Sequence, residues 1–145
     1  MDGGVSQTHL GSCHCGAIRL EFVTVLELTQ IAPRQCGCKY CLKHQANWFA
    51  DPQGSLQLKS VVAPTRYRFG TRTADFVMCP NCGVLVAATC TIEGIDYGIL
   101  NLACLDDRKD WIAPNKLSDF DGEETSDRLA RRMKNWMPVQ LEMPG

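Results

Sequence analysis

The sequence predicts a mainly β protein of short strands with one helix near the C-terminus. Several segments alternate apolar and polar residues, which is the period of a half-buried strand. Glycine and proline separate these segments, as expected at turns. Toward the end of the chain the pattern becomes helical, and the cysteines gather in short clusters at three places.

The first predicted strand spans residues 17–23, where Ile18, Leu20 and Phe22 alternate with polar positions. Residues 1–10 before it show no strand pattern and are expected to form an irregular lead-in. Similar alternation, or a short apolar run between turn residues, predicts five further strands. They are expected over residues 55–62, 66–69, 76–78, 83–88 and 99–105.

A C-terminal helix is predicted over residues 122–136. Acidic residues lead and basic residues follow, which matches the helix dipole. The helix is expected to begin at Asp121 or Gly122 and to end before Pro138. Three large apolar residues at positions i, i+4 and i+7 predict one buried face. They are Leu129, Met133 and Trp136.

Seven of the nine cysteines fall within residues 13–15, 36–41 and 79–82. Thiolates two or three residues apart converge on one soft cation, and zinc is the usual occupant. The sequence Cys79-Pro80-Asn81-Cys82-Gly83 has the form of a zinc knuckle at the tip of a hairpin. Glycine tolerates the backbone conformation that turns amide groups toward the sulfurs.

Two thiols cannot close a structural zinc site, so the knuckle needs a second pair. Cys13 and Cys15 are the best partners, because glycine and a strand follow them too. A zinc held by these residues with Cys79 and Cys82 closes a loop of more than sixty residues and stabilises the fold.

Three thiols remain at C-x-C-x-x-C spacing, and they leave the fourth position of a second zinc to water, substrate or a distant side chain. These are Cys36, Cys38 and Cys41. His44, Cys90 and Cys104 are the candidates that could close this site. We expect Cys90 and Cys104 to be core thiols, since both lie in apolar segments. His44 is expected at the surface or near the site, and His14 is expected to be exposed.

Composition narrows the function classes. The chain has 145 residues and a formal net charge of −1, so we expect one zinc-binding domain over 1–145, with its core over 9–120. Near-neutral charge gives no pull toward nucleic acid or an anionic membrane, and no run of 18 apolar residues predicts a membrane span. The N-terminus lacks the pattern of a secretory signal, which favours the cytoplasm. In a reducing compartment, metal ligands and thiols are favoured over disulfides.

Taken together, residues 11–18, 36–41 and 79–83 resemble the glutathione-dependent formaldehyde-activating enzyme family, whose domain is shared with centromere protein V. The resemblance covers residues 9–105. It implies a β-tent of mostly antiparallel strands. It also implies a structural zinc on Cys13, Cys15, Cys79 and Cys82, and a catalytic zinc on Cys36, Cys38 and Cys41. Gly37, Lys39 and the segment 106–112 depart from the pattern of many members.

The activity implied by this resemblance is that of a zinc-dependent carbon–sulfur lyase, with two zinc ions per chain. Glutathione would add reversibly to formaldehyde, or a related small aldehyde, to give S-(hydroxymethyl)glutathione. The carboxylates of glutathione require cations, and side chains near the trio offer candidates for substrate binding. These are Arg34, Lys39, Tyr40 and His44, with Lys43 as a further cation and Trp48 and Phe49 as possible walls.

Two other functions remain open at this point. A non-catalytic, zinc-stabilised binding module would complete the trio with a fourth protein ligand and open no pocket beside it. A thiol redox or metal-handling protein would hold metal loosely in the trio and form a disulfide within it.

Overall fold

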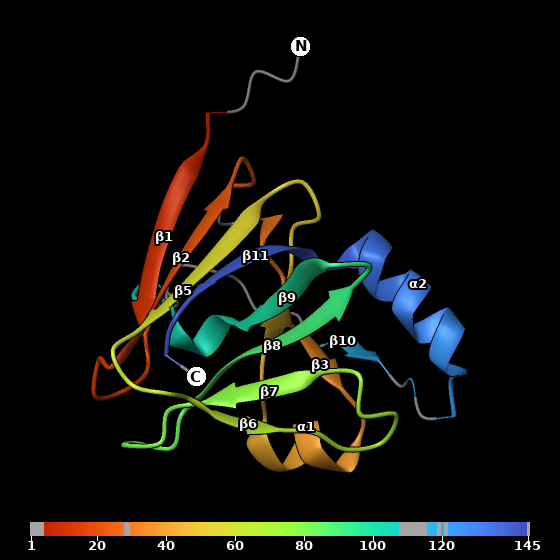
Figure 1. Cartoon of the computed structure of the whole chain (residues 1–145). Coiled ribbons are helices and arrows are strands. Elements are labelled where there is room, and N and C mark those ends of the chain that lie inside the picture. Colours follow the sequence, from red (N-terminus) through yellow and green to blue (C-terminus); the bar gives the residue numbers. More distant parts are fainter. Residues whose placement is uncertain (1–4, 28–29, 108–115, 119, 121, 145) are drawn as a thin grey trace.

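The computed structural model describes residues 5–27, 30–107, 116–118, 120 and 122–144. It is mainly β, as predicted, with a helix near the C-terminus (Figure 1). The elements in chain order are β1 (Gln7–Ser12), β2 (Ile18–Thr24), β3 (Arg34–Cys36), α1 (Lys39–His44), β4 (Trp48–Phe49), β5 (Ser55–Ser60), β6 (Thr65–Tyr67), β7 (Asp75–Met78), β8 (Leu85–Ile92), β9 (Ile95–Asn101), the 3-10 turn η2 (Leu102–Cys104), β10 (Lys116–Ser118), α2 (Thr125–Asn135) and β11 (Met137–Glu142). No helix in these ranges is both long and apolar enough to cross a membrane.

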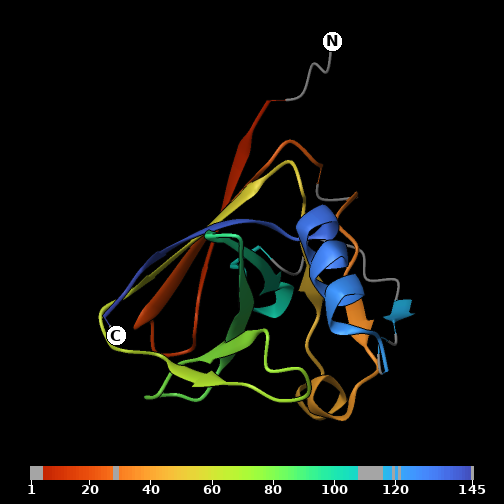
Figure 2. The ribbon, with the colours of Figure 1, turned by 45° about the vertical axis from the view of Figure 1, so that its right-hand side comes forward.

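One path of paired strands runs β1-β2-β5-β11-β9-β4-β3-β10, and β6-β7-β8 joins it at β9. β9 uses both of its edges, since Gly98 pairs with Thr89 of β8 and with Met137 of β11. Most pairs are antiparallel, as expected. Among the described residues two pairs are parallel instead, β11 with β5 and β10 with β3. In Figure 2, α2 (blue) lies at the right of the view and β1 (red) at the left.

The alternating segments form strands as the sequence predicted. Ile18, Leu20 and Phe22 of β2 are fully buried, and Leu56 and Leu58 of β5 pack in the same core. β7 and β8 are antiparallel and flank the cysteine knuckle, which confirms the predicted hairpin.

Several elements differ from the predictions. The expected lead-in over 1–10 is wrong for its last part, because β1 begins at Gln7 and pairs with β2. The strand expected over 99–105 ends at Asn101, whose side chain accepts a hydrogen bond from the N–H of Ala103 and begins η2. Residues 108–112 of the atypical segment, and Asp121, lie outside the described residues.

Helix α2 confirms the predicted C-terminal helix, and two of the three residues predicted for its buried face lie there. Leu129 and Trp136 pack into the core, whereas Met133 is 40% exposed. Arg132 takes the buried place, with 6% of its surface exposed. The buried face of this helix is therefore mixed, with an arginine between two apolar residues.

Candidate metal centres and their cavity

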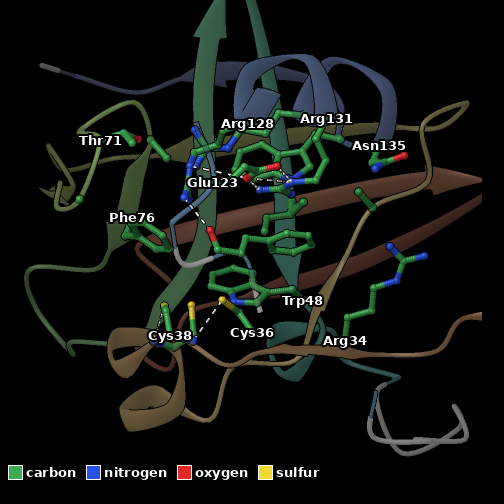
Figure 3. Close-up of a pocket in the computed structure, with 18 of the residues that line it drawn as sticks. Arg34, Cys36, Cys38, Trp48, Thr71, Phe76, Glu123, Arg128, Arg131 and Asn135 are labelled. Atoms are coloured by element: carbon green, nitrogen blue, oxygen red, sulfur yellow. Dashed lines mark hydrogen bonds and ion pairs between the residues drawn. The ribbon is translucent and has the colours of Figure 1, made fainter. Parts of the chain in front are cut away.

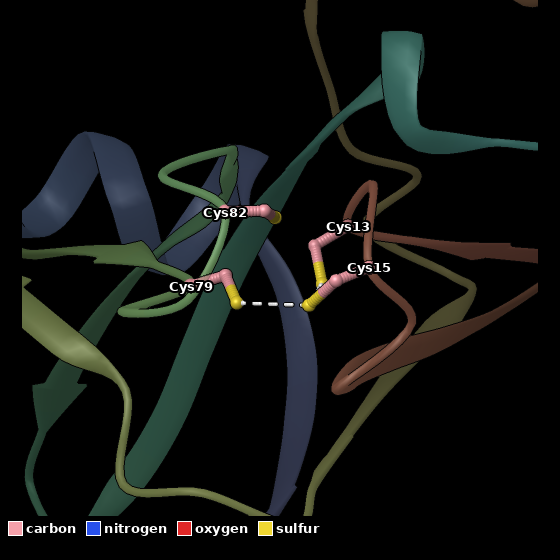
Figure 4. A group of neighbouring side chains, drawn as sticks. All are labelled: Cys13, Cys15, Cys79 and Cys82. Carbon is pink, nitrogen blue, oxygen red and sulfur yellow. Dashed lines mark hydrogen bonds between the residues drawn. The ribbon is translucent and has the colours of Figure 1, made fainter.

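The first cysteine group brings together two distant hairpin turns (Figure 4). Cys13 and Cys15 lie between β1 and β2, and Cys79 and Cys82 lie between β7 and β8. The four sulfurs lie within 4.8 Å of one another. A Zn–S bond of ~2.3 Å places the sulfurs of a tetrahedral site ~3.8 Å apart. The Cys13–Cys15 separation of 3.8 Å and the Cys15–Cys79 separation of 3.5 Å fit that geometry.

Backbone amides surround the sulfurs of this group. The N–H of Ile18 donates to Cys13 Sγ at 3.3 Å, and the N–H of Asn81 donates to Cys79 Sγ at 3.4 Å. The N–H of Val84, with that of Cys15, lowers the pKa of Cys82 to about 6. Donors aimed at sulfur favour thiolates, the form that binds zinc. The donor set therefore suits a closed, four-sulfur zinc site.

The second group follows the end of β3. Cys36 is the last residue of β3, Cys38 caps α1, and Cys41 lies within α1. The N–H of Cys38 donates to Cys36 Sγ at 3.5 Å, and the N–H of Cys41 donates to Cys38 Sγ at 3.4 Å. These three sulfurs also lie within 4.8 Å of one another, close enough to share one ion.

Proton sharing and burial raise the pKa values of two of these thiols. A hydrogen bond with Cys36, and then burial, raise the pKa of Cys41, while the side chain of Trp48 donates to Cys41 and opposes the rise. Burial raises the pKa of Cys38. A bound metal would displace these protons, because it requires thiolates.

The described residues place no fourth His, Cys, Asp or Glu within the trio's cluster. His44 instead packs its ring against Tyr40, with centroids 4.5 Å apart. Cys90 is buried, and its sulfur lies 3.6 Å from Nη1 of Arg132. Cys104 is also buried and donates to the carbonyl of Leu85. The trio thus presents three sulfurs and an open side.

That open side faces a cavity of about 460 Å³. Cys36, Cys38 and Cys41 lie in its wall together with Trp48 and Phe49 of β4, so the proposed wall residues do line it. Figure 3 shows the labelled sulfurs on one side of Trp48 and residues of α2 on the other. The remaining described lining comes from β3, β7, β9, the β6–β7 connection and the segment from Phe120 to Trp136.

The four predicted substrate contacts do not come together. Arg34 lines the cavity, but Lys39, Tyr40 and His44 are not among its lining residues. Lys39 and His44 are exposed on α1. Tyr40 donates its hydroxyl to Met78 Sδ at 3.6 Å, and burial raises its pKa to about 12.

Tyr40 also belongs to a cluster of aromatic rings. Its ring centroid lies 4.7 Å from that of Phe76 and 5.0 Å from that of Phe69. These contacts give Tyr40 a packing role beside the cavity.

Sequence reasoning missed the polar stripe of α2. Five residues of this helix line the cavity: Thr125, Arg128, Arg131, Arg132 and Asn135. The last four stand at positions i, i+3, i+4 and i+7. That spacing places them on one helical face. This polar spacing is visible in the sequence, but the prediction of the buried face considered only the apolar residues of the helix.

Comparison with known proteins places this geometry in a family. Residues 8–120, more than half of the chain, match the family described as glutathione-dependent formaldehyde-activating enzyme. The chain belongs to the glutathione-dependent formaldehyde-activating enzyme family. The matched residues include both cysteine groups of the family domain, whereas α2 lies beyond them.

A crystal structure of a Rhodobacter sphaeroides protein is similar in fold. It is 24% identical, with a TM-score of 0.53, over 75% of this chain and 99% of the other. At this identity the likeness extends to the fold alone.

Proposed function

We propose that the protein is a zinc-dependent carbon–sulfur lyase that adds glutathione reversibly to formaldehyde or a related small aldehyde. The observation that carries the proposal is the three-sulfur group in the wall of a 460 Å³ cavity, without a fourth ligand among the described residues. Family membership supports glutathione and formaldehyde as the substrate pair. We place this activity in a reducing compartment such as the cytoplasm, where clustered thiols are favoured as metal ligands over disulfides.

The reaction forms one carbon–sulfur bond and needs no oxidant. The S–H bond of the thiol breaks, the sulfur attacks the carbonyl carbon, and the proton ends on the former carbonyl oxygen. A zinc ion on Cys36, Cys38 and Cys41 would supply the positive centre that favours an ionised substrate thiol. A second, structural zinc would be held by the four sulfurs of Cys13, Cys15, Cys79 and Cys82, which fit a closed tetrahedral site.

The chain's own residues prepare this site. The backbone N–H groups of Cys38 and Cys41 donate to trio sulfurs, and the Trp48 side chain donates to Cys41. These donors spread the negative charge of three thiolates, which otherwise weakens the electrophilic character of the metal. Phe49 and Phe76 add apolar walls, which exclude water and strengthen electrostatic interactions in the cavity.

The cavity weighs against a non-catalytic binding module, because that hypothesis requires a closed trio with no pocket beside it. The redox hypothesis keeps one supporting observation, the close approach of three thiols. The redox hypothesis predicts a different experimental result from the lyase hypothesis: mild oxidation would form a disulfide within the trio, and the zinc would leave readily.

Exchange NMR on a mixture of glutathione and formaldehyde tests the proposal. The zinc-loaded protein should accelerate the interconversion of glutathione and its hydroxymethyl adduct above the rate in buffer. Cys38→Ser should abolish the acceleration and remain folded, while Cys104→Ser is the matched control, because it removes a buried thiol outside the cavity. Equal rates with and without the wild-type protein would contradict the proposal.

A further inference from the structure

The described lining of the cavity carries an excess of positive charge. Four arginines contribute to it, Arg34, Arg128, Arg131 and Arg132, against Glu123 and Glu124. Three of these arginines come from two turns of α2. Guanidinium groups placed so close together repel one another unless anions lie between them. The arrangement therefore favours the binding of a negatively charged ligand.

Glu123 neutralises only part of this positive charge. It receives two hydrogen bonds from Nε of Arg131 and one from Nη2, at 3.1 to 3.3 Å. The guanidinium of Arg131 also lies 3.6 Å from the ring centroid of Phe120. Arg131 is thus held by the protein itself, as a salt-bridged and stacked side chain.

Arg128 and Arg132 keep donors without acceptors. Nη2 of Arg128 donates to the carbonyl of Phe120. Its buried Nε forms an ion pair with Glu123 at 3.7 Å but has no hydrogen-bond partner. Arg132 donates from Nη1 to Thr73 at 2.7 Å, while its Nε is buried and has no partner.

Arg132 is buried, with only 6% of its surface exposed, yet it forms no ion pair with any carboxylate of the described residues. A buried charge with an unpaired donor is unfavourable unless a hydrogen-bond acceptor or an opposite charge binds it. Burial lowers the pKa of Arg132, while its contact with Cys90 opposes this and the nearby charges of Arg128 and Arg131 add to it.

We propose that Arg128 and Arg132 form a carboxylate-binding subsite for the thiol substrate, with the sulfur of that substrate directed to Cys36, Cys38 and Cys41. The inference rests on the proposed function and adds the residues that would select the substrate. Guanidinium groups bind carboxylates with two parallel hydrogen bonds, which fixes orientation as well as charge. Figure 3 shows Arg128 and the labelled sulfurs on opposite sides of Trp48, so a ligand with two functional ends suits the cavity.

The arginines of the subsite lie outside the residues that match the family. α2 spans Thr125–Asn135 and lies beyond residues 8–120, which match the family. The matched residues supply the sulfurs, and α2 supplies Arg128 and Arg132. Substrate choice would then depend on a segment beyond the matched residues.

Binding of S-methylglutathione to the zinc-loaded full-length protein tests the subsite without the reaction. Its methylated sulfur cannot ionise, but both carboxylates remain. Arg128→Gln should weaken its affinity by about 10- to 100-fold, the effect of losing one charge-assisted hydrogen bond. Lys134→Gln is the matched control, since it removes one positive charge from α2 outside the cavity lining and should leave the affinity unchanged.

A second ligand and a second variant sharpen the test. The diethyl ester of S-methylglutathione should bind weakly to the wild-type protein and lose nothing further in Arg128→Gln. Arg132→Lys keeps the charge of a buried side chain but removes the planar donor pair, and should also weaken binding of the diacid. In steady-state kinetics, Arg128→Gln should raise the KM for glutathione more than it lowers kcat.

The outcomes separate the subsite from the reaction. Affinity for S-methylglutathione that is absent in the wild type, or unchanged in Arg128→Gln, would overturn the subsite. Arginine-dependent binding without any acceleration of the glutathione–formaldehyde exchange would keep the subsite and reject the proposed reaction. Acceleration with the same KM in wild type and Arg128→Gln would keep the reaction and reject the subsite.

Discussion

At the scale of single residues, two glycines shape the turns that carry the four-sulfur group. Gly16 follows Cys15 with φ of 84°, and Gly83 follows Cys82 with φ of 81°. An added Cβ would meet no atom within 4 Å at either position, so space is not the constraint. The constraint is the left-handed backbone, which only glycine adopts without strain.

Replacing Gly83 by alanine should therefore destabilise the protein by about 1–2 kcal/mol through backbone strain alone. Urea unfolding of the zinc-loaded protein measures this change. Gly83→Asn is the matched control and should lose less, because asparagine tolerates the left-handed region better than alanine. A Gly83→Ala protein as stable as the wild type would show that the turn relaxes to another conformation.

Residue-scale prediction succeeded where a short motif carries its own geometry. The spacing of Cys13, Cys15, Cys79 and Cys82 indicated one group, and the structure brings these sulfurs together. Tyr40 and His44 stack on each other and are not among the lining residues of the cavity, so their role as substrate contacts stays a prediction. Proximity in sequence to the trio did not determine the direction of these side chains, because α1 turns them toward the aromatic cluster.

At the scale of elements, alternation identified the strands that are buried on one face, such as β2 and β5. It missed β11, whose partners β5 and β9 lie far away in the sequence. It also missed β1, which has buried residues at His9 and Gly11 in place of large apolar side chains. Such strands are specified by their neighbours in space, and those neighbours are not visible in a local pattern.

Gly11 shows how closely β1 approaches its neighbour. A Cβ at this position would collide with the backbone carbonyl oxygen of Cys104, and Gly11 forms a bridge with Leu105. Gly11→Ala should therefore lower the free energy of unfolding by about 1–3 kcal/mol, the usual effect of overpacking. Thermal unfolding measures it, with Leu10→Ala as the control, because Leu10 is 53% exposed. Equal losses in both variants would contradict this account of β1.

At the scale of the whole molecule, the two cysteine groups have different relations to the fold. The four-sulfur group joins the β1–β2 turn to the β7–β8 hairpin, residues 64 apart in sequence at Cys15 and Cys79. The trio instead lies within one short stretch and borders the cavity. The sequence indicated this division, but the cavity itself combines β3, β4, β9 and α2, and only tertiary structure could reveal it.

Native mass spectrometry of protein purified without chelator tests the central claim, two separate zinc sites with the trio as the exposed one. The wild type should carry two zinc ions and form a non-covalent complex with glutathione. Cys38→Ser should keep one zinc, remain folded and lose the glutathione complex, whereas Cys79→Ser should lose the structural zinc and much of its stability. A wild-type protein with a single zinc, or a Cys38→Ser variant that keeps both zinc ions and binds glutathione unchanged, would contradict the account.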